Sequence, residues 1–166
     1  GGVGSFAVQI ARALGGRVTA VTRTDSLDRV RALGAVEVVD HTTTDATHLD
    51  RRFDLVFDAG GNGSLLAWRH VIASGGRMVI CGAGTGDWLG PLLRPGFGVV
   101  LSKLDSRTWV PFLAKRELAD LEQLGAWLAD GTIDPVIERT YPLTEAAEAV
   151  RHVESGRARG KVVITI

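Results

Sequence analysis

The stretch GGVGSFAVQIARAL, residues 1–14, decides the fold predicted for this chain. Its larger apolar residues recur at the spacing of one helix face: Phe6, Ile10, Ala13 and Leu14. A glycine turn is therefore expected to lead into an amphipathic helix that Gly15 and Gly16 end. Residues 17–21, RVTAV, then have the character of a buried strand. Turn, helix and strand in this order form the second half of a βαβ unit.

The glycines of this turn are candidate contacts of a dinucleotide. In a dinucleotide-binding βαβ unit, Gly1 would let the backbone approach a pyrophosphate, Gly4 would let the helix pack closely on its strand, and the helix N-terminus would attract the phosphates. Gly2 and Val3 complete the turn. A plain turn is the alternative, since short glycine clusters often mark one. The strand that precedes such a turn is missing, so we expect a chain truncated within the motif.

Composition sets limits on the function. The chain has 166 residues, 45% of them hydrophobic, which predicts one domain. Lys plus Arg and Asp plus Glu both number 19, which argues against nucleic acid or a membrane as the main partner. The sequence has neither a leader pattern nor an apolar run near the roughly 20 residues that span a bilayer. The single cysteine, Cys81, excludes an intrachain disulfide, and we expect a cytoplasmic protein.

Strands and helices are expected to alternate along the rest of the chain. This alternation predicts an α/β fold with a doubly wound parallel sheet of the Rossmann type, its first strand missing. Pro111 lacks an amide donor and predicts an edge position for its strand. Strands are expected at 36–39, 53–58, 77–81, 108–113, 136–141 and 161–166, and helices at 24–33, 65–73, 118–128 and 144–154.

With these segments placed, nearly the whole chain resembles the nucleotide-binding part of the medium-chain dehydrogenase/reductases, which include the zinc-binding dehydrogenases and the quinone oxidoreductases. The resemblance rests on residues 1–22, RALGAVEVVD, FDLVFDAGGNGS, GGRMVICG and above all the ending DPVIERTYPLTEAAEAVRHVESGRARGKVVITI. It implies a nicotinamide cofactor on the glycine turn, hydride transfer at C4 of its ring, and a separate N-terminal substrate domain. Residues 1–166 would then be an NAD(P)-binding domain fragment, of which about 136–166 rejoins the substrate domain.

Two more turns follow strand ends, where open α/β sheets bind ligands. Their candidate contacts are Gly60, Gly61 and Asn62 after one strand, and Gly82 and Ala83 after the next. The first group has an alternative role as the cap of the next helix, for which Ser64 is also a candidate cap. Cys81 is more typical of a small buried residue than of a nucleophile.

The segment that follows the second strand predicts a preference for NADP(H) over NAD(H). NAD-specific sites place an acid there to accept hydrogen bonds from the ribose hydroxyls. Here Thr22, Arg23 and Thr24 stand instead, and an arginine can bind a 2′-phosphate with two hydrogen bonds. Asp25 follows, and His41 stands where many relatives have a tyrosine beside the adenosine, so we count His41 among the candidate contacts. An exposed arginine at a helix start is the alternative.

No metal site is predicted. The four histidines lack the spacing of paired ligands and have no cysteine support. In the zinc-dependent branch of the resembled family the ligands come mainly from the absent domain, so zinc dependence is undecidable from this sequence, and the catalytic residues are unknown for the same reason. A basic cluster near the C-terminus is a candidate phosphate contact or a solvated face: Arg151, Arg157, Arg159 and Lys161.

These features predict the cofactor-binding domain of an NADPH-dependent oxidoreductase of the quinone or enone reductase or alcohol dehydrogenase type. Its substrate would be a small carbonyl, quinone or alcohol, and the fragment alone should be inactive. A non-catalytic NAD(P)-binding structural or redox-sensing protein is the alternative. Thr22 argues against a methyltransferase, which would carry an acid there. We also expect the edge strand near 108–113 to pair with its copy in a homodimer that covers Trp109 and Phe112, unless Pro111 blunts that edge.

Overall fold

We describe a computed structural model of the chain, which covers residues 1–60, 63–81, 98, 102, 106–156 and 158–166. The chain divides into two compact units. One unit combines residues 1–44 with 116–166, and the other holds residues 45–115.

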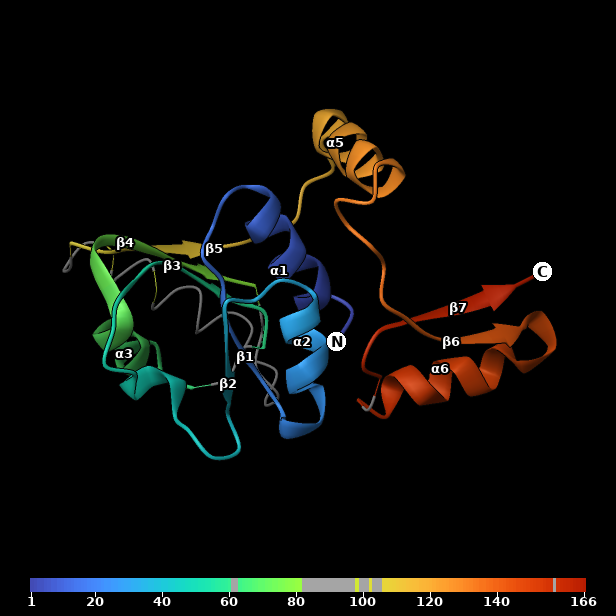
Figure 1. Cartoon of the computed structure of the whole chain (residues 1–166), viewed down its shortest axis with the longest axis horizontal. Coiled ribbons are helices and arrows are strands. Elements are labelled where there is room, and N and C mark those ends of the chain that lie inside the picture. Colours follow the sequence, from blue (N-terminus) through green and yellow to red (C-terminus); the bar gives the residue numbers. More distant parts are fainter. Residues whose placement is uncertain (61–62, 82–97, 99–101, 103–105, 157) are drawn as a thin grey trace. The chain divides into compact units, whose positions relative to one another are not determined.

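The first unit opens with the glycine turn and the helix α1 (Gly4–Ala13). Strand β1 (Thr19–Thr22), a 3₁₀ turn (Thr24–Ser26), helix α2 (Leu27–Ala32) and strand β2 (Glu37–Asp40) follow (Figure 1). β1 and β2 pair in parallel, with Thr22 opposite Asp40. The sequence therefore predicted these elements correctly to within two residues at most ends, because period and glycine stops are local signals.

The same unit ends with a second parallel pair. Helix α5 (Leu118–Ala129) precedes strand β6 (Ile137–Pro142), a 3₁₀ turn (Leu143–Glu145), helix α6 (Ala146–Glu154) and strand β7 (Lys161–Thr165). β6 and β7 pair in parallel, and α6 lies along the pair (Figure 1). Gln9 on α1 makes hydrogen bonds to the segment that precedes β6. Its side-chain amide donates to the carbonyl oxygen of Asp134 at 2.9 Å and accepts from the Asp134 N–H at 2.8 Å.

The second unit, residues 45–115, is a three-stranded parallel sheet in the order β3-β4-β5. Its strands are β3 (Phe53–Asp58), β4 (Ile72–Ile80) and β5 (Thr108–Pro111), and a 3₁₀ turn (Ala46–His48) precedes them. The short helix α3 (Leu65–Trp68) is capped by Ser64, as expected, and a 3₁₀ turn (Arg69–Val71) follows it. A buried cluster forms the core of this unit: Leu65, Ile72, Met78, Ile80 and Trp109.

Two expectations about this unit were wrong in detail. The predicted helix 65–73 ends early, and β4 begins at Ile72 and runs through Gly75 and Gly76. The strand continues because Gly75 adopts φ +76° at a register shift, where Phe53 pairs with Ile72 but Leu55 pairs with Arg77. Leu55 and Phe57 are exposed, so the residues of this unit leave one face of β3 uncovered.

The α/β fold with parallel strands is confirmed, since every described strand pair is parallel. The described strands do not join in one sheet, however: β1-β2, β3-β4-β5 and β6-β7 form separate sheets. In the usual order of a doubly wound sheet, the first strand lies between the second and the fourth. Here these are β1 and β3, which belong to different units.

Candidate functional site

The glycine turn leaves the N-terminus of α1 without a side-chain cap. Val3 stands at the N-cap and has no side-chain oxygen to accept from the first amides, and the first turn holds no acidic residue. The amide of Ser5 donates to the carbonyl oxygen of Gly1 at 3.1 Å. The Ser5 hydroxyl is buried and has no hydrogen-bond partner among the described residues. Uncapped amides and an unpaired hydroxyl fit an anion such as a diphosphate.

The space around the three glycines differs. A Cβ on Gly1 would lie 3.7 Å from the carbonyl oxygen of Ala158, and one on Gly2 would lie 3.0 Å from the Nζ atom of Lys161. A Cβ on Gly4 would meet no described atom within 4 Å. The expectation that Gly4 lets the helix pack closely on the strand before the turn stays a prediction, because no described atom lies near enough to test it. Gly4 opens onto free space beside the helix terminus.

The C-terminal segment lies against this turn. The Nζ atom of Lys161 stands 5.4 Å from the ring centroid of Phe6 on α1. Arg29 on α2 donates to the carbonyl oxygen of Arg159 at 2.8 Å. Of the predicted basic cluster, the structure thus brings Lys161 to the glycine turn and Arg159 to Arg29 on α2. Arg151 is exposed on α6, and position 157 lies outside the described residues.

Asp25 holds two arginines at the end of β1. Its carboxylate lies 2.9 Å from the Nη2 atom of Arg159 and 3.8 Å from the Nε atom of Arg23. The Ser26 hydroxyl donates to the same carboxylate at 2.9 Å. This hydrogen bond is the largest cause that keeps the pKa of Asp25 below its ordinary value, and Arg159 and Arg23 act in the same direction. Asp25 lies within the 3₁₀ turn and is not the N-cap residue of α2, which is Ser26.

Thr22 and Thr24, which the sequence placed beside the ribose of the cofactor, make hydrogen bonds to other residues of the chain. The Thr24 hydroxyl donates to Asp40 at the end of β2, and Thr42 donates to the same carboxylate at 2.7 Å. The hydrogen bond from Thr24 is the main cause of the lowered pKa of Asp40. The carbonyl oxygen of Thr22 accepts a hydrogen bond from the amide of His41, whose side chain is exposed. Arg23 thus stands beside the Asp25 carboxylate, where a 2′-phosphate was expected to bind.

The other predicted contacts belong to residues 45–115. Gly60 follows β3 and is exposed. At the end of the same strand, the carbonyl oxygen of Asp58 accepts a hydrogen bond from the amide of Cys81 at 2.9 Å. Burial raises the pKa of the Cys81 thiol, and Asp58 adds to the effect, so Cys81 lacks the character of a nucleophile. Four further candidates lie outside the described residues: Gly61, Asn62, Gly82 and Ala83.

Zinc ligands do not gather within the part of the chain that the structure describes. In it, no three His, Cys, Asp or Glu side chains meet as metal ligands would. His48 pairs with Asp45 at 2.9 Å and His152 with Glu138 at 3.3 Å. These residues do not fit a zinc site, and we derive no step through a metal.

Sequence reasoning missed two residues that shape the site. Glu138 on β6 accepts hydrogen bonds from the amides of Arg159 and Gly160 and so fixes the turn before β7. Arg29 holds the same turn through the carbonyl oxygen of Arg159. Both residues act on backbone groups far away in the sequence, so their own surroundings in the sequence carry no signal of the contact.

The fold and the glycine turn define a Rossmann-type α/β protein. The profile of a family described as zinc-binding dehydrogenase matches residues 33–164, and the chain belongs to that family. This confirms the resemblance to the nucleotide-binding part of the medium-chain dehydrogenase/reductases.

Relatives across organisms cover the whole chain. The chain is 35% identical to the NAD(P)H oxidoreductase RTN4IP1, mitochondrial, of Mus musculus, over 100% of this chain and 46% of that protein. It is 30% identical to the NADPH-dependent alkenal/one oxidoreductase, chloroplastic, of Arabidopsis thaliana, over 99% of this chain and 38% of that protein. The solved structure of an NAD-dependent alcohol dehydrogenase superposes with a TM-score of 0.80 at 30% identity, over 99% of this chain and 48% of that one.

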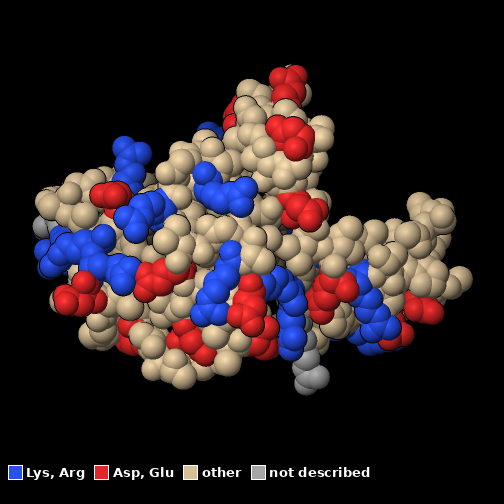
Figure 2. All heavy atoms as spheres, viewed as in Figure 1, with Lys and Arg blue, Asp and Glu red and all other residues tan. Residues whose placement is uncertain are grey.

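The chain thus spans less than half the length of these relatives. Two of them carry organelle names, so the cytoplasmic location stays a prediction. Within the described residues, no helix combines the length and the apolar character needed to cross a membrane. Figure 2 shows acidic and basic side chains interspersed on the face in view, in keeping with the balanced composition.

Proposed function

We propose that this chain is the cofactor-binding part of an NADPH-dependent oxidoreductase of the quinone or enone reductase or alcohol dehydrogenase type. Its substrate would be a small carbonyl, quinone or alcohol. The observation that carries the proposal is the uncapped N-terminus of α1, with Arg23 at the end of β1. The printed names of the relatives, which are NAD(P)H- and NADPH-dependent oxidoreductases, support it.

In this proposal the chain binds and orients the cofactor, which supplies hydride transfer at C4 of its nicotinamide ring. The amides at the start of α1 and the Ser5 hydroxyl hold the diphosphate, and the positive end of the helix favours its charge. The guanidinium group of Arg23 binds the ribose 2′-phosphate. The proposed contacts are those predicted from the sequence: Gly1, Gly2, Val3, Gly4, Thr22, Arg23, Thr24, His41, Gly60, Gly61, Asn62, Gly82 and Ala83.

The cofactor preference is tested with Arg23→Ala in the full gene product. Arg23 makes one or two charge-assisted hydrogen bonds to a phosphate, each worth about 1.5–3 kcal/mol, so the ratio of kcat/KM for NADPH over NADH should fall at least about tenfold. Arg31→Ala is the matched control, because Arg31 also pairs with an aspartate, Asp28 at 2.7 Å, on the surface of α2. Equal efficiencies of the native protein with both cofactors would contradict the NADPH assignment.

Cofactor binding without turnover by the full gene product would favour the non-catalytic alternative. The activity belongs to the longer protein in this proposal, because substrate positioning and proton transfer need groups from its other part. The chain alone should therefore show no steady oxidation of NADPH.

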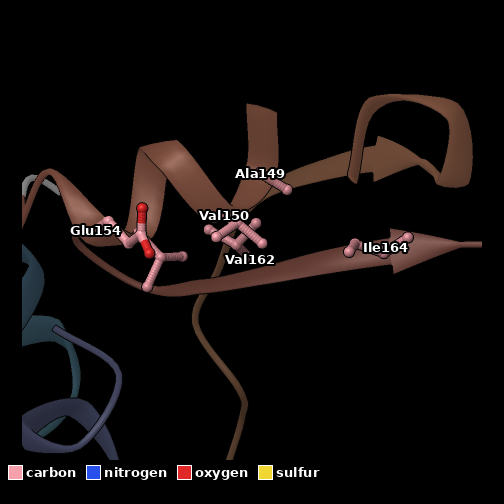
Figure 3. Close-up of a pocket in the computed structure, with 6 residues that line it drawn as sticks. Ala149, Val150, Glu154, Val162 and Ile164 are labelled. Atoms are coloured by element: carbon pink, nitrogen blue, oxygen red, sulfur yellow. The ribbon is translucent and has the colours of Figure 1, made fainter. Parts of the chain in front are cut away.

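We also propose that residues 136–166 rejoin the substrate domain. Ile137, Val150 and Val153 on this part are each more than half exposed. An apolar hollow of about 220 Å³ lies between α6 and β7, and Figure 3 shows Val150, Val162 and Ile164 along it. A face of this kind is typical of a surface that another part of a protein covers.

A homodimer through β5 is the last part of the proposal. The edge of β5 away from β4 has no strand partner among the described residues, and Phe112 and Leu113 are exposed beside it. Trp109 is only 2% exposed in the core of its own unit, so the expectation that a partner subunit covers it was wrong. Phe112→Asp should shift the full gene product from dimer to monomer in sedimentation at micromolar concentration. A native protein that already sediments as a monomer would refute the pairing.

A further inference from the structure

Two arginines from distant parts of the chain meet at one carboxylate. Arg159 lies in the turn before β7 and Arg23 directly after β1, and both approach opposite oxygens of Asp25. All three side chains are between 40% and 47% exposed. Ion pairs this exposed add little to stability, because water and side-chain entropy offset the attraction. The arrangement therefore calls for another explanation than the stability of the fold.

The position of Arg159 is fixed by its backbone. Its carbonyl oxygen accepts from Arg29 at 2.8 Å, and its amide donates to Glu138. The next amide, of Gly160, donates to the same carboxylate at 3.1 Å. Three hydrogen bonds thus hold this turn against α2 and β6 before any ligand arrives. Because the backbone of Arg159 is already fixed, little conformational entropy is lost there on binding. A contact of its side chain with a ligand then contributes more to the affinity.

The chemistry of the pair suits a phosphomonoester. Two guanidinium groups around one small anion can each donate to separate oxygens, and a phosphate offers more charge and more acceptor oxygens than a carboxylate. The place is the end of the second strand, about 20 residues after the glycine turn, where dinucleotide sites hold the ribose 2′ position. Asp25 occupies the point between the arginines in the protein without ligand.

We propose that Arg159 is a second 2′-phosphate-binding residue beside Arg23, and that Asp25 holds both arginines in place until the phosphate replaces it. This inference rests on the proposed function and deepens it: it assigns the specificity for NADPH to a residue of the C-terminal turn as well as to the end of β1. Asp25 then opposes binding, because its charge repels the phosphate and its ion pairs must be broken.

The test titrates adenosine 2′,5′-bisphosphate and adenosine 5′-monophosphate into the full gene product by calorimetry. The two probes differ only in the 2′-phosphate. Arg159→Gln should weaken binding of the bisphosphate about tenfold or more and leave the monophosphate within about twofold, as expected for one lost charge-assisted contact. Asp25→Asn should strengthen binding of the bisphosphate about three- to tenfold. Arg31→Gln, which breaks the pair with Asp28, should change neither value.

Other outcomes would overturn the inference. If Arg159→Gln weakens both probes equally, or neither, then Arg159 does not bind the 2′-phosphate. If Asp25→Asn weakens the monophosphate, then Asp25 accepts hydrogen bonds from the ribose hydroxyl, and the site is built for NADH. The Asp25 variant keeps the test decisive even if Arg159→Gln folds poorly. The proposed function fails separately, if the native protein binds neither probe and neither nicotinamide cofactor.

Discussion

The three-stranded sheet of residues 45–115 and the β6-α6-β7 part differ in how far they bury their apolar side chains. In the sheet, Ile72 and Met78 are fully buried and Trp109 nearly so. In the β6-α6-β7 part, Tyr141 and Ala149 are buried, but Val150 and Val153 on α6 remain more than half exposed. The first region thus buries a core of its own residues, although Leu55 and Phe57 on β3 stay exposed. The second keeps an apolar face that nothing in its own unit covers.

The largest expected effect comes from the core of the sheet. Met78→Ala should lower the free energy of unfolding by about 2–5 kcal/mol, because it removes buried methylene groups and leaves a cavity. Val150→Ala is the matched change on the exposed face. It should cost within about 0.5 kcal/mol in this chain, and more than about 1 kcal/mol in the full gene product if another domain covers α6 there. Urea denaturation measures these three changes in the free energy of unfolding. If Val150→Ala lowers it equally little in this chain and in the full gene product, another domain does not cover α6.

A smaller effect is expected at the contact between α1 and the segment before β6. Gln9 is 5% exposed, and Gln9→Leu leaves the N–H and C=O groups of Asp134 without their partner. The expected loss is about 1–3 kcal/mol, with faster hydrogen exchange in β6 than before and no change in β4. Gln123→Leu on the exposed surface of α5 is the control. Faster exchange in β4 as well would show that the two regions unfold together.

The smallest effect is a pH dependence in the turn that carries Arg159. The amide of Arg159, above all, keeps the pKa of Glu138 below the ordinary value of 4.5, with smaller effects of His152 and the Gly160 amide. A pKa lowered in the folded state gives stability that is present above about 4.5 and is lost as the pH falls through the folded value. Glu138→Gln should lower Tm by roughly 2 °C at pH 7. The difference from the native protein should shrink as the pH falls below 4.5 and the carboxylate becomes protonated.

The control for this pH dependence is Glu148→Gln, since Glu148 is exposed on α6. A difference in Tm between native protein and Glu138→Gln that grows towards acid would mean that Glu138 does not stabilise the turn through its charged form. Other carboxylates with lowered pKa values, such as Asp40 and Asp45, are present in both proteins and so cancel in this difference.

Local signals in the sequence predicted most elements because they depend on neighbours alone. The helical period of residues 4–13 and the glycine stop after them gave α1, and the Ser64 cap predicted the start of α3. The early start of β4 at Ile72 was missed, because the shift at Gly75 depends on the register with β3. Pro111 predicted an edge strand, and β5 is one among the described strands. The side on which Trp109 packs depends on tertiary contacts, and that prediction was wrong.

The sequence by itself determined the class of fold, the family and the place of the glycine turn, because short patterns of residue types indicate each of them. It also indicated Arg23 as the candidate for the 2′-phosphate. Only the tertiary structure decided that Arg159 meets Arg23 at Asp25, that Gln9 binds Asp134, and that Thr24 donates to Asp40. These contacts join residues that are far apart along the chain, and no local period or spacing encodes which distant groups folding will bring within hydrogen-bond distance.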